Sequence, residues 1–205
     1  LNKEGVAPLK ADLAQLMQVS ELQHVTIAVA RIHMAAGNPL FGIGVSADLM
    51  NSNINALYAD QSGLGMGNRD YYLDEENAAK REGYITWLTK AFGFIGWADA
   101  EAKAKDVLAF ETKMAEKFRS NVALRDVAAN YNPTTRKEFV KKYSAFDWDA
   151  YFKAMGLKEF EHMVVGQPET LENMCAMLKS EKLDVVKSYM VASLLSSAAG
   201  SLGDN

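Results

Sequence analysis

The amino-acid sequence predicts a mainly α-helical fold that contains one small β-hairpin. Apolar residues recur every three or four positions along most of the 205 residues, which is the period of an α-helix. Over residues 41–45 apolar residues instead alternate with glycine, which is the period of a β-strand. Hydrophobic residues make up 49% and charged residues 23% of the chain, a balance typical of folded proteins.

The expected helices are placed by their apolar stripes and by their end signals. Ser20 with Gln23 and Thr135 with Glu138 have the spacing of a capping box, and Pro8 suits a first helical turn. The last helix is apolar around most of its circumference, so it must be buried or lie against a partner. We expect helices over residues 8–17, 20–36, 74–95, 99–119, 147–155, 167–178 and 183–199, with a further helix starting at Thr135.

The hairpin is expected at about residues 40–59. Its second strand begins near Ile54, and the segment D-L-M-N-S-N between the strands supplies turn residues. Residues 163–165 form a short extended piece, and Asn132-Pro133 is predicted to be a turn. No repeat or flexible linker divides the chain, so we expect one domain over residues 1–205.

The composition argues against several classes of function and structure. The formal net charge is -4 and no lysine or arginine run offsets it, which argues against nucleic acid as a partner. A single cysteine, Cys175, excludes an intramolecular disulfide but leaves the cellular compartment open. The longest apolar stretch, near residues 185–195, contains polar residues and is too short to span a bilayer.

The glycine-spaced segment D-Q-S-G-L-G-M-G-N-R-D-Y-Y-L, residues 60–73, invites a phosphate-binding interpretation. A dinucleotide fingerprint requires a third glycine where Asn68 stands, and a P-loop requires a G-K-[ST] end that is absent. Alternate glycines without those partners typically provide positive φ angles or close backbone packing. The pattern therefore favours a structural bend.

Arg69 and Asp70 allow two interpretations, because a charged pair between glycines and tyrosines is expected to be partly buried. In the structural one, Arg69 pairs with a carboxylate such as Glu111, which lies on the apolar side of its helix, and Asp70 accepts backbone N–H groups. In the functional one, Arg69 and Asp70 face a cavity and Arg69 holds a substrate carboxylate. The structural interpretation is favoured.

No catalytic constellation is present in the sequence. None of the three histidines, His24, His33 and His162, belongs to an H-E-x-x-H pair, so no metal ligands are predicted. Cys175 lies on an apolar helix face without a nearby base, and Ser62 is outside a G-x-S-x-G motif. We therefore predict no catalytic residue and no cofactor in this chain.

Six stretches resemble, in order, the neprilysin and endothelin-converting-enzyme family of zinc metallopeptidases. Residues 58–73 resemble the family's Q-x-G-L-G-L-P-x-R-D-Y-Y bend, although Gly67 stands where members often have proline. Thr170 likewise stands where members often have tyrosine. The other five stretches are F-G-I-G-V-S-A-D-L-M-N-S (41–52), L-A-F-E-T-K-M-A (108–115), N-Y-N-P-T-T (130–135), F-D-W-D-A-Y-F-K-A-M-G-L (146–157) and V-V-G-Q-P-E-T-L (164–171).

The resemblance implies that this chain is an internal fragment, the helical domain that caps the catalytic domain. The family's zinc is held by H-E-x-x-H and E-x-x-x-D in the C-terminal part, and neither motif occurs here. The parent is thus expected to be a zinc metalloendopeptidase that hydrolyses oligopeptides with a zinc-activated water. The fragment itself should be inactive without the missing C-terminal catalytic domain. A cell-envelope, periplasmic or extracellular location is implied as well.

A second function class remains open. A self-contained helical module without any catalytic partner domain, which binds a partner protein through its apolar last helix, would have the same composition. The reading frame beyond Asn205 separates the two, because only a peptidase would continue into both zinc motifs.

Overall fold

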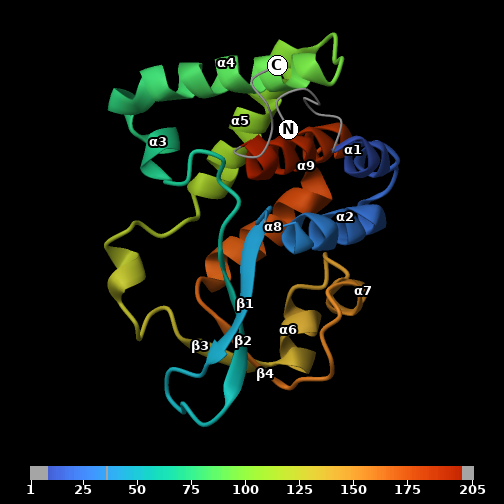
Figure 1. Ribbon diagram of the computed structural model, residues 1–205. Coiled ribbons are helices and arrows are strands. Elements are labelled where there is room, and N and C mark those ends of the chain that lie inside the picture. The colour runs from blue at the N-terminus through green and yellow to red at the C-terminus, as the bar shows by residue number, and fades with distance from the viewer. Residues whose placement is uncertain (1–8, 36, 200–205) are drawn as a thin grey trace.

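The computed structural model describes residues 9–35 and 37–199. It is mainly α-helical with one small sheet, which confirms the predicted fold class (Figure 1). Pro8, expected in the first helical turn, lies outside the described residues. The helices are α1 (Lys10–Met17), α2 (Leu22–Met34), α3 (Asp70–Leu73), α4 (Ala78–Phe94), α5 (Ala100–Ala115), α6 (Arg136–Lys142), α7 (Trp148–Ala154), α8 (Pro168–Ser180) and α9 (Leu183–Ala198), with short 3-10 turns η2 (Glu75–Asn77) and η3 (Ala123–Arg125).

Helix α9 is the centre of the helical layer. It packs against α1, α2, α4 and α5, so segments from both ends of the described chain meet on it (Figure 1). Its apolar circumference is therefore covered by other helices of the same chain. The buried residues of α9 are Val186, Ser188, Tyr189, Met190, Val191, Ala192, Leu194 and Leu195.

Within the described residues the sheet has four strands in the order β1-β2-β4-β3. Strands β1 (Phe41–Ala47) and β2 (Asn55–Gln61) form the antiparallel hairpin, and β4 (His162–Val165) pairs parallel to β2. The turn predicted at Asn132-Pro133 is wrong, because β3 (Asn132–Thr135) pairs antiparallel to β4. Proline is tolerated there because β3 is an edge strand, where a missing N–H breaks no second ladder.

The two predicted capping boxes have different outcomes. At α6 the Thr135 side chain accepts from the backbone of Glu138 while the Glu138 side chain accepts from the backbone of Thr135, which confirms that box. At α2 the box is wrong, because Glu21 is the N-cap residue and makes no side-chain cap bond. The Ser20 hydroxyl instead lies 3.4 Å from Nδ1 of His24.

An aromatic cluster fastens the base of the hairpin to α7. Phe41, the first residue of β1, contacts the rings of Phe146, Trp148 and Tyr151 at centroid distances of 5.6, 4.9 and 5.3 Å. All four side chains are buried, and Trp148 donates its indole N–H to the backbone oxygen of Tyr143 at 2.9 Å. The packed rings hold the start of β1 in place against α7.

Candidate functional site

The glycine-spaced segment is a bend held by a tyrosine of α9. Gly63 and Gly67 have φ angles of 102° and 81°, in the left-handed region that favours glycine. The Tyr189 hydroxyl donates to the Gly63 carbonyl at 2.8 Å and accepts from the Leu40 N–H at 2.8 Å. One buried hydroxyl thus joins the chain before β1 to the chain after β2.

Gly65 is required for a different reason, which is space. A Cβ atom built at this position would overlap the phenol group of Tyr84 and would come within 3.2 Å of the Glu111 carboxylate. Its φ angle is not positive, so the missing side chain rather than the backbone conformation is what the site needs. Both observations give the glycines structural roles.

Beneath the bend lies a buried carboxylate. Glu111 is 2% exposed, and its two oxygens accept hydrogen bonds from the Tyr72 hydroxyl at 2.5 Å and the Tyr84 hydroxyl at 3.0 Å. Burial raises the pKa of Glu111 to about 7, while the hydrogen bonds from both tyrosines and from the Gly65 N–H act against that rise. Burial, followed by the charge of Glu111, raises the pKa of both phenols.

Arg69 and Asp70 are half-buried at the end of the same bend. Nε of Arg69 donates to the Ala115 carbonyl at 3.4 Å, which connects the bend to the end of α5. The backbone N–H of Asp70 is held by the Asn68 side chain at 3.0 Å. The partners of the Glu111 carboxylate are the two phenols and not the guanidinium of Arg69. Among the described residues Arg69 makes no ion pair within 4.0 Å.

A second buried carboxylate organises the hairpin turn. Asp48 accepts from the backbone N–H groups of Met50 and Asn51 at 2.9 and 2.8 Å, in an aspartate turn. The Tyr131 hydroxyl at 2.9 Å and Nε2 of His162 at 2.7 Å also contact this carboxylate. The hydrogen bond with His162 is the main cause that lowers the pKa of Asp48 to about 2. The turn is readable from D-L-M-N-S-N, whereas Tyr131 and His162 meet Asp48 only through the fold.

An arginine–glutamate pair closes the loop between α5 and β3. Nε and Nη2 of Arg119 bind the two carboxylate oxygens of Glu169 at 2.5 and 3.0 Å. The same guanidinium donates to the Ala129 carbonyl at 2.7 Å and to the Asn130 side chain at 3.1 Å. Sequence reasoning missed this pair, and its one signal is Glu169 in the first turn of α8.

In the described chain each histidine contacts a different partner. His33 lies 2.5 Å from the Tyr151 hydroxyl, and burial lowers its pKa to about 4. Within residues 9–35 and 37–199 no group of three or more His, Cys, Asp and Glu side chains has an arrangement that would hold a metal ion. Among the same residues, no helix is long and apolar enough to cross a bilayer.

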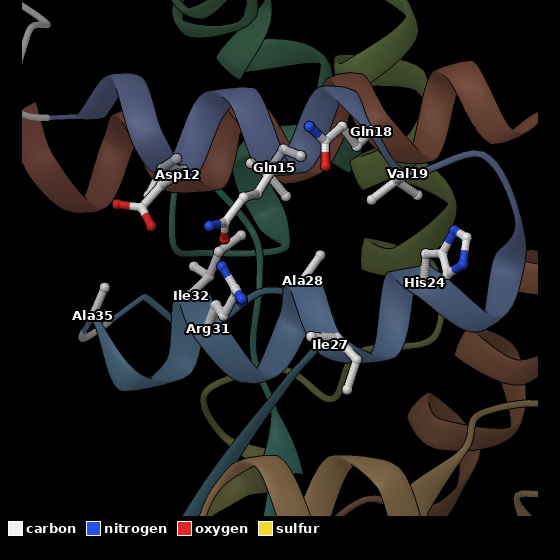
Figure 2. Close-up of a pocket in the computed structure, with 12 residues that line it drawn as sticks. Asp12, Gln15, Gln18, Val19, His24, Ile27, Ala28, Arg31, Ile32 and Ala35 are labelled. Atoms are coloured by element: carbon white, nitrogen blue, oxygen red, sulfur yellow. The ribbon is translucent and has the colours of Figure 1, made fainter.

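A groove of about 310 Å³ lies between α1 and α2 (Figure 2). Leu16, Ala28 and Leu194 contribute apolar surface to it. Figure 2 shows that Gln15 and Arg31 extend from the two helices toward the space between them. An apolar surface with a few polar groups at its margin is suited to a peptide side chain or a small ligand.

The comparisons with known proteins agree on one family. The family model of the N-terminal part of peptidase family M13, described as "Peptidase family M13", matches residues 1–205. Endothelin-converting enzyme 1 of Homo sapiens is 31% identical over 178 residues, which cover 83% of this chain and 23% of that protein. The neutral endopeptidase of Lactobacillus helveticus is 24% identical over 201 residues, covering 96% of this chain and 31% of that protein.

A solved structure of similar fold extends this agreement. The zinc metalloprotease ZMP1 of Mycobacterium tuberculosis, in its open state, superposes with a TM-score of 0.93 at 26% identity, covering 98% of this chain and 32% of that one. The chain thus spans between 23% and 32% of the length of these relatives. The resemblance to neprilysin-like metallopeptidases is confirmed, and the chain belongs to peptidase family M13.

Proposed function

We propose that this chain is the non-catalytic helical domain of a neprilysin-like zinc metalloendopeptidase, and that it encloses the chamber in which oligopeptides are cut. The observation that carries the proposal is the family match over residues 1–205 together with the partial coverage of longer peptidase relatives. In this proposal the missing C-terminal domain of the same chain holds the zinc and supplies the zinc-activated water. This chain contributes walls that exclude water and large substrates.

The sequence supports the part of the proposal that makes this chain non-catalytic. H-E-x-x-H and E-x-x-x-D are both absent from the 205 residues, so neither a zinc site nor its general base is available. We expect the 205-residue chain, folded and supplied with zinc, to leave an oligopeptide substrate intact. Hydrolysis by that preparation would contradict the assignment.

The decisive experiment uses the parent protein. The full-length parent should cleave oligopeptides, lose activity with a chelator and regain it with zinc. It should leave folded proteins intact, because only short peptides enter the chamber. A parent without either zinc motif, which binds another protein instead, would favour the self-contained binding module.

We propose the groove of Figure 2 as part of the chamber wall. In the full-length parent, Gln15→Trp should fill the groove and raise KM for peptides several-fold with little change in kcat. Lys10→Trp is the matched control, because Lys10 is exposed on the same helix and does not line the groove. An unchanged KM for Gln15→Trp would remove the groove from the wall.

Arg69 and Asp70 also remain candidates for the cavity. Among the described residues only Nε of Arg69 is engaged, which leaves its terminal N–H groups available for a peptide carboxylate. If Arg69 has that role, Arg69→Lys in the full-length parent should raise KM for peptides with a free C-terminus and not for amidated peptides. An equal KM for both would restrict Arg69 to fixing the bend.

The location proposed for the parent is the cell envelope, the periplasm or the extracellular space.

A further inference from the structure

The tip of the hairpin, residues 45–54, exposes four large apolar side chains. Val45, Leu49, Met50 and Ile54 are all exposed, with Met50 at 76% of its possible surface. Figure 1 shows the hairpin extending away from the helical layer, with β1 and β2 running out beyond the other strands. Exposed apolar side chains gathered at one tip are unfavourable in water unless something covers them.

The exposed tip continues a face of the sheet that is core elsewhere. Phe41, Ile43 and Val45 lie on one side of β1, because alternate residues of a strand share a face. Phe41 is fully buried, Ile43 is half-buried and Val45 is 62% exposed. The apolar face thus extends beyond the point at which the rest of the described chain covers it.

The turn at the tip is preorganised. The buried Asp48 carboxylate binds two backbone N–H groups of the turn and is held from outside the hairpin by Tyr131 and His162. Leu49 is fixed too, since its N–H donates to the Tyr58 hydroxyl at 3.1 Å. A turn that is held in one conformation before binding loses less entropy when a partner covers it.

We propose that this hairpin tip is a docking surface for the remainder of the parent polypeptide, the part that carries the catalytic domain. The inference rests on the proposed function. The support is the length of polypeptide that lies outside this structure. The chain covers 32% of the superposed peptidase, so a polypeptide of about twice its own length remains that could cover the hairpin tip. A second copy of the chain is the competing occupant.

Methionine oxidation in the full-length parent tests the contact. Dilute hydrogen peroxide oxidises exposed thioethers, and peptide mass spectrometry gives the rate at Met50 in the native protein and in the same protein unfolded in urea. A covered Met50 should oxidise at least ten-fold more slowly in the native protein, at every protein concentration. Equal rates overturn the proposal, and so does protection that appears only with dimer formation.

A pair of variants makes the test specific. Leu49→Asp should expose Met50 and restore most of its oxidation rate, because it places a charge in the apolar contact. Phe94→Asp is the control, since Phe94 is 63% exposed on α4 at the opposite end of the molecule, and it should leave Met50 protected (Figure 1). Persistent protection of Met50 in Leu49→Asp would contradict the proposed contact.

Peptide hydrolysis measured on the same samples separates the two proposals. An active enzyme with an unprotected Met50 overturns the docking surface and leaves the proposed function intact. A protein that protects Met50 within one chain but shows no zinc-dependent hydrolysis overturns the proposed function while supporting the contact.

Discussion

Tyr72 donates its hydroxyl proton to Glu111 across 2.5 Å, although 39 positions separate the two residues in the chain. The bond connects α3, at the end of the glycine-spaced segment, to the C-terminal half of α5. Because Glu111 is buried, loss of this donor would leave one carboxylate oxygen without its strongest partner.

We therefore expect Tyr72→Phe to lower the free energy of unfolding by about 1–3 kcal/mol, the range for a buried polar group that loses its partner. Tyr71→Phe is the matched control, since its hydroxyl makes no hydrogen bond with the described residues and its ring contacts Lys80. Urea denaturation of both variants checks the prediction. Equal stabilities would contradict a structural role for the Tyr72–Glu111 bond.

The raised pKa of Glu111 predicts how stability depends on pH. Because about 7 lies above the ordinary value of 4.5, the folded protein keeps a proton that the unfolded chain releases between those pH values. This contribution to stability is complete below pH 4.5 and is lost as the pH rises through 7, by up to about 3 kcal/mol.

Glu111→Gln isolates that effect. The difference in unfolding free energy between the native protein and Glu111→Gln should shrink or change sign between pH 5 and pH 8, since glutamine does not titrate. Taking the difference cancels His33, whose lowered pKa acts in the opposite sense as the pH rises. A difference that is constant with pH would contradict the buried carboxylate.

Close packing at Gly65 predicts the effect of a single methyl group. Gly65→Ala should destabilise the protein by about 1–3 kcal/mol, the usual cost of overpacking, because the new Cβ displaces the Tyr84 phenol from Glu111. Gly44→Ala is the control, since a Cβ there meets open space. Thermal unfolding compares the two, and a neutral Gly65→Ala would show that the bend can relax.

The Arg119–Glu169 pair predicts the protease sensitivity of the loop that precedes β3. Arg119→Ala should speed tryptic cleavage after Arg125 about ten-fold, a change of about 1.4 kcal/mol in local opening, because four guanidinium hydrogen bonds hold that loop closed. Arg31→Ala, an exposed arginine of α2, should leave the rate unchanged. Equal cleavage of both variants would contradict the loop-closing role.

The helices and the hairpin were predictable because their signals are local. The helical stripes, the alternation at 41–45 and the Thr135–Glu138 box depend on neighbours within a few positions. The Ser20–Gln23 pattern does not form a capping box, because Glu21 is extended and is itself the N-cap residue of α2. The spacing of Ser20 and Gln23 does not reveal this backbone conformation. Strand β3 was missed because four residues containing a proline resemble a turn until β4 pairs with them.

The buried polar contacts were less accessible to sequence reasoning. The burial of Glu111 could be predicted from its place on an apolar helix face. Its two partners could not be predicted, because a tyrosine fits the pattern of a core residue whether or not its hydroxyl makes a hydrogen bond. Tyr131 and His162 reach Asp48 from 83 and 114 positions away. Such pairs are fixed by strand order and register, which no short motif encodes.

The central place of α9 has a consequence for synthesis on the ribosome. The helices that it joins, α1, α2, α4 and α5, emerge from the exit tunnel well before it does. Until Tyr189 emerges, the backbone groups of Leu40 and Gly63 lack the hydroxyl that connects them. Since contacts between distant segments slow folding, the apolar faces of these earlier helices stay open to chaperones until α9 has been synthesised.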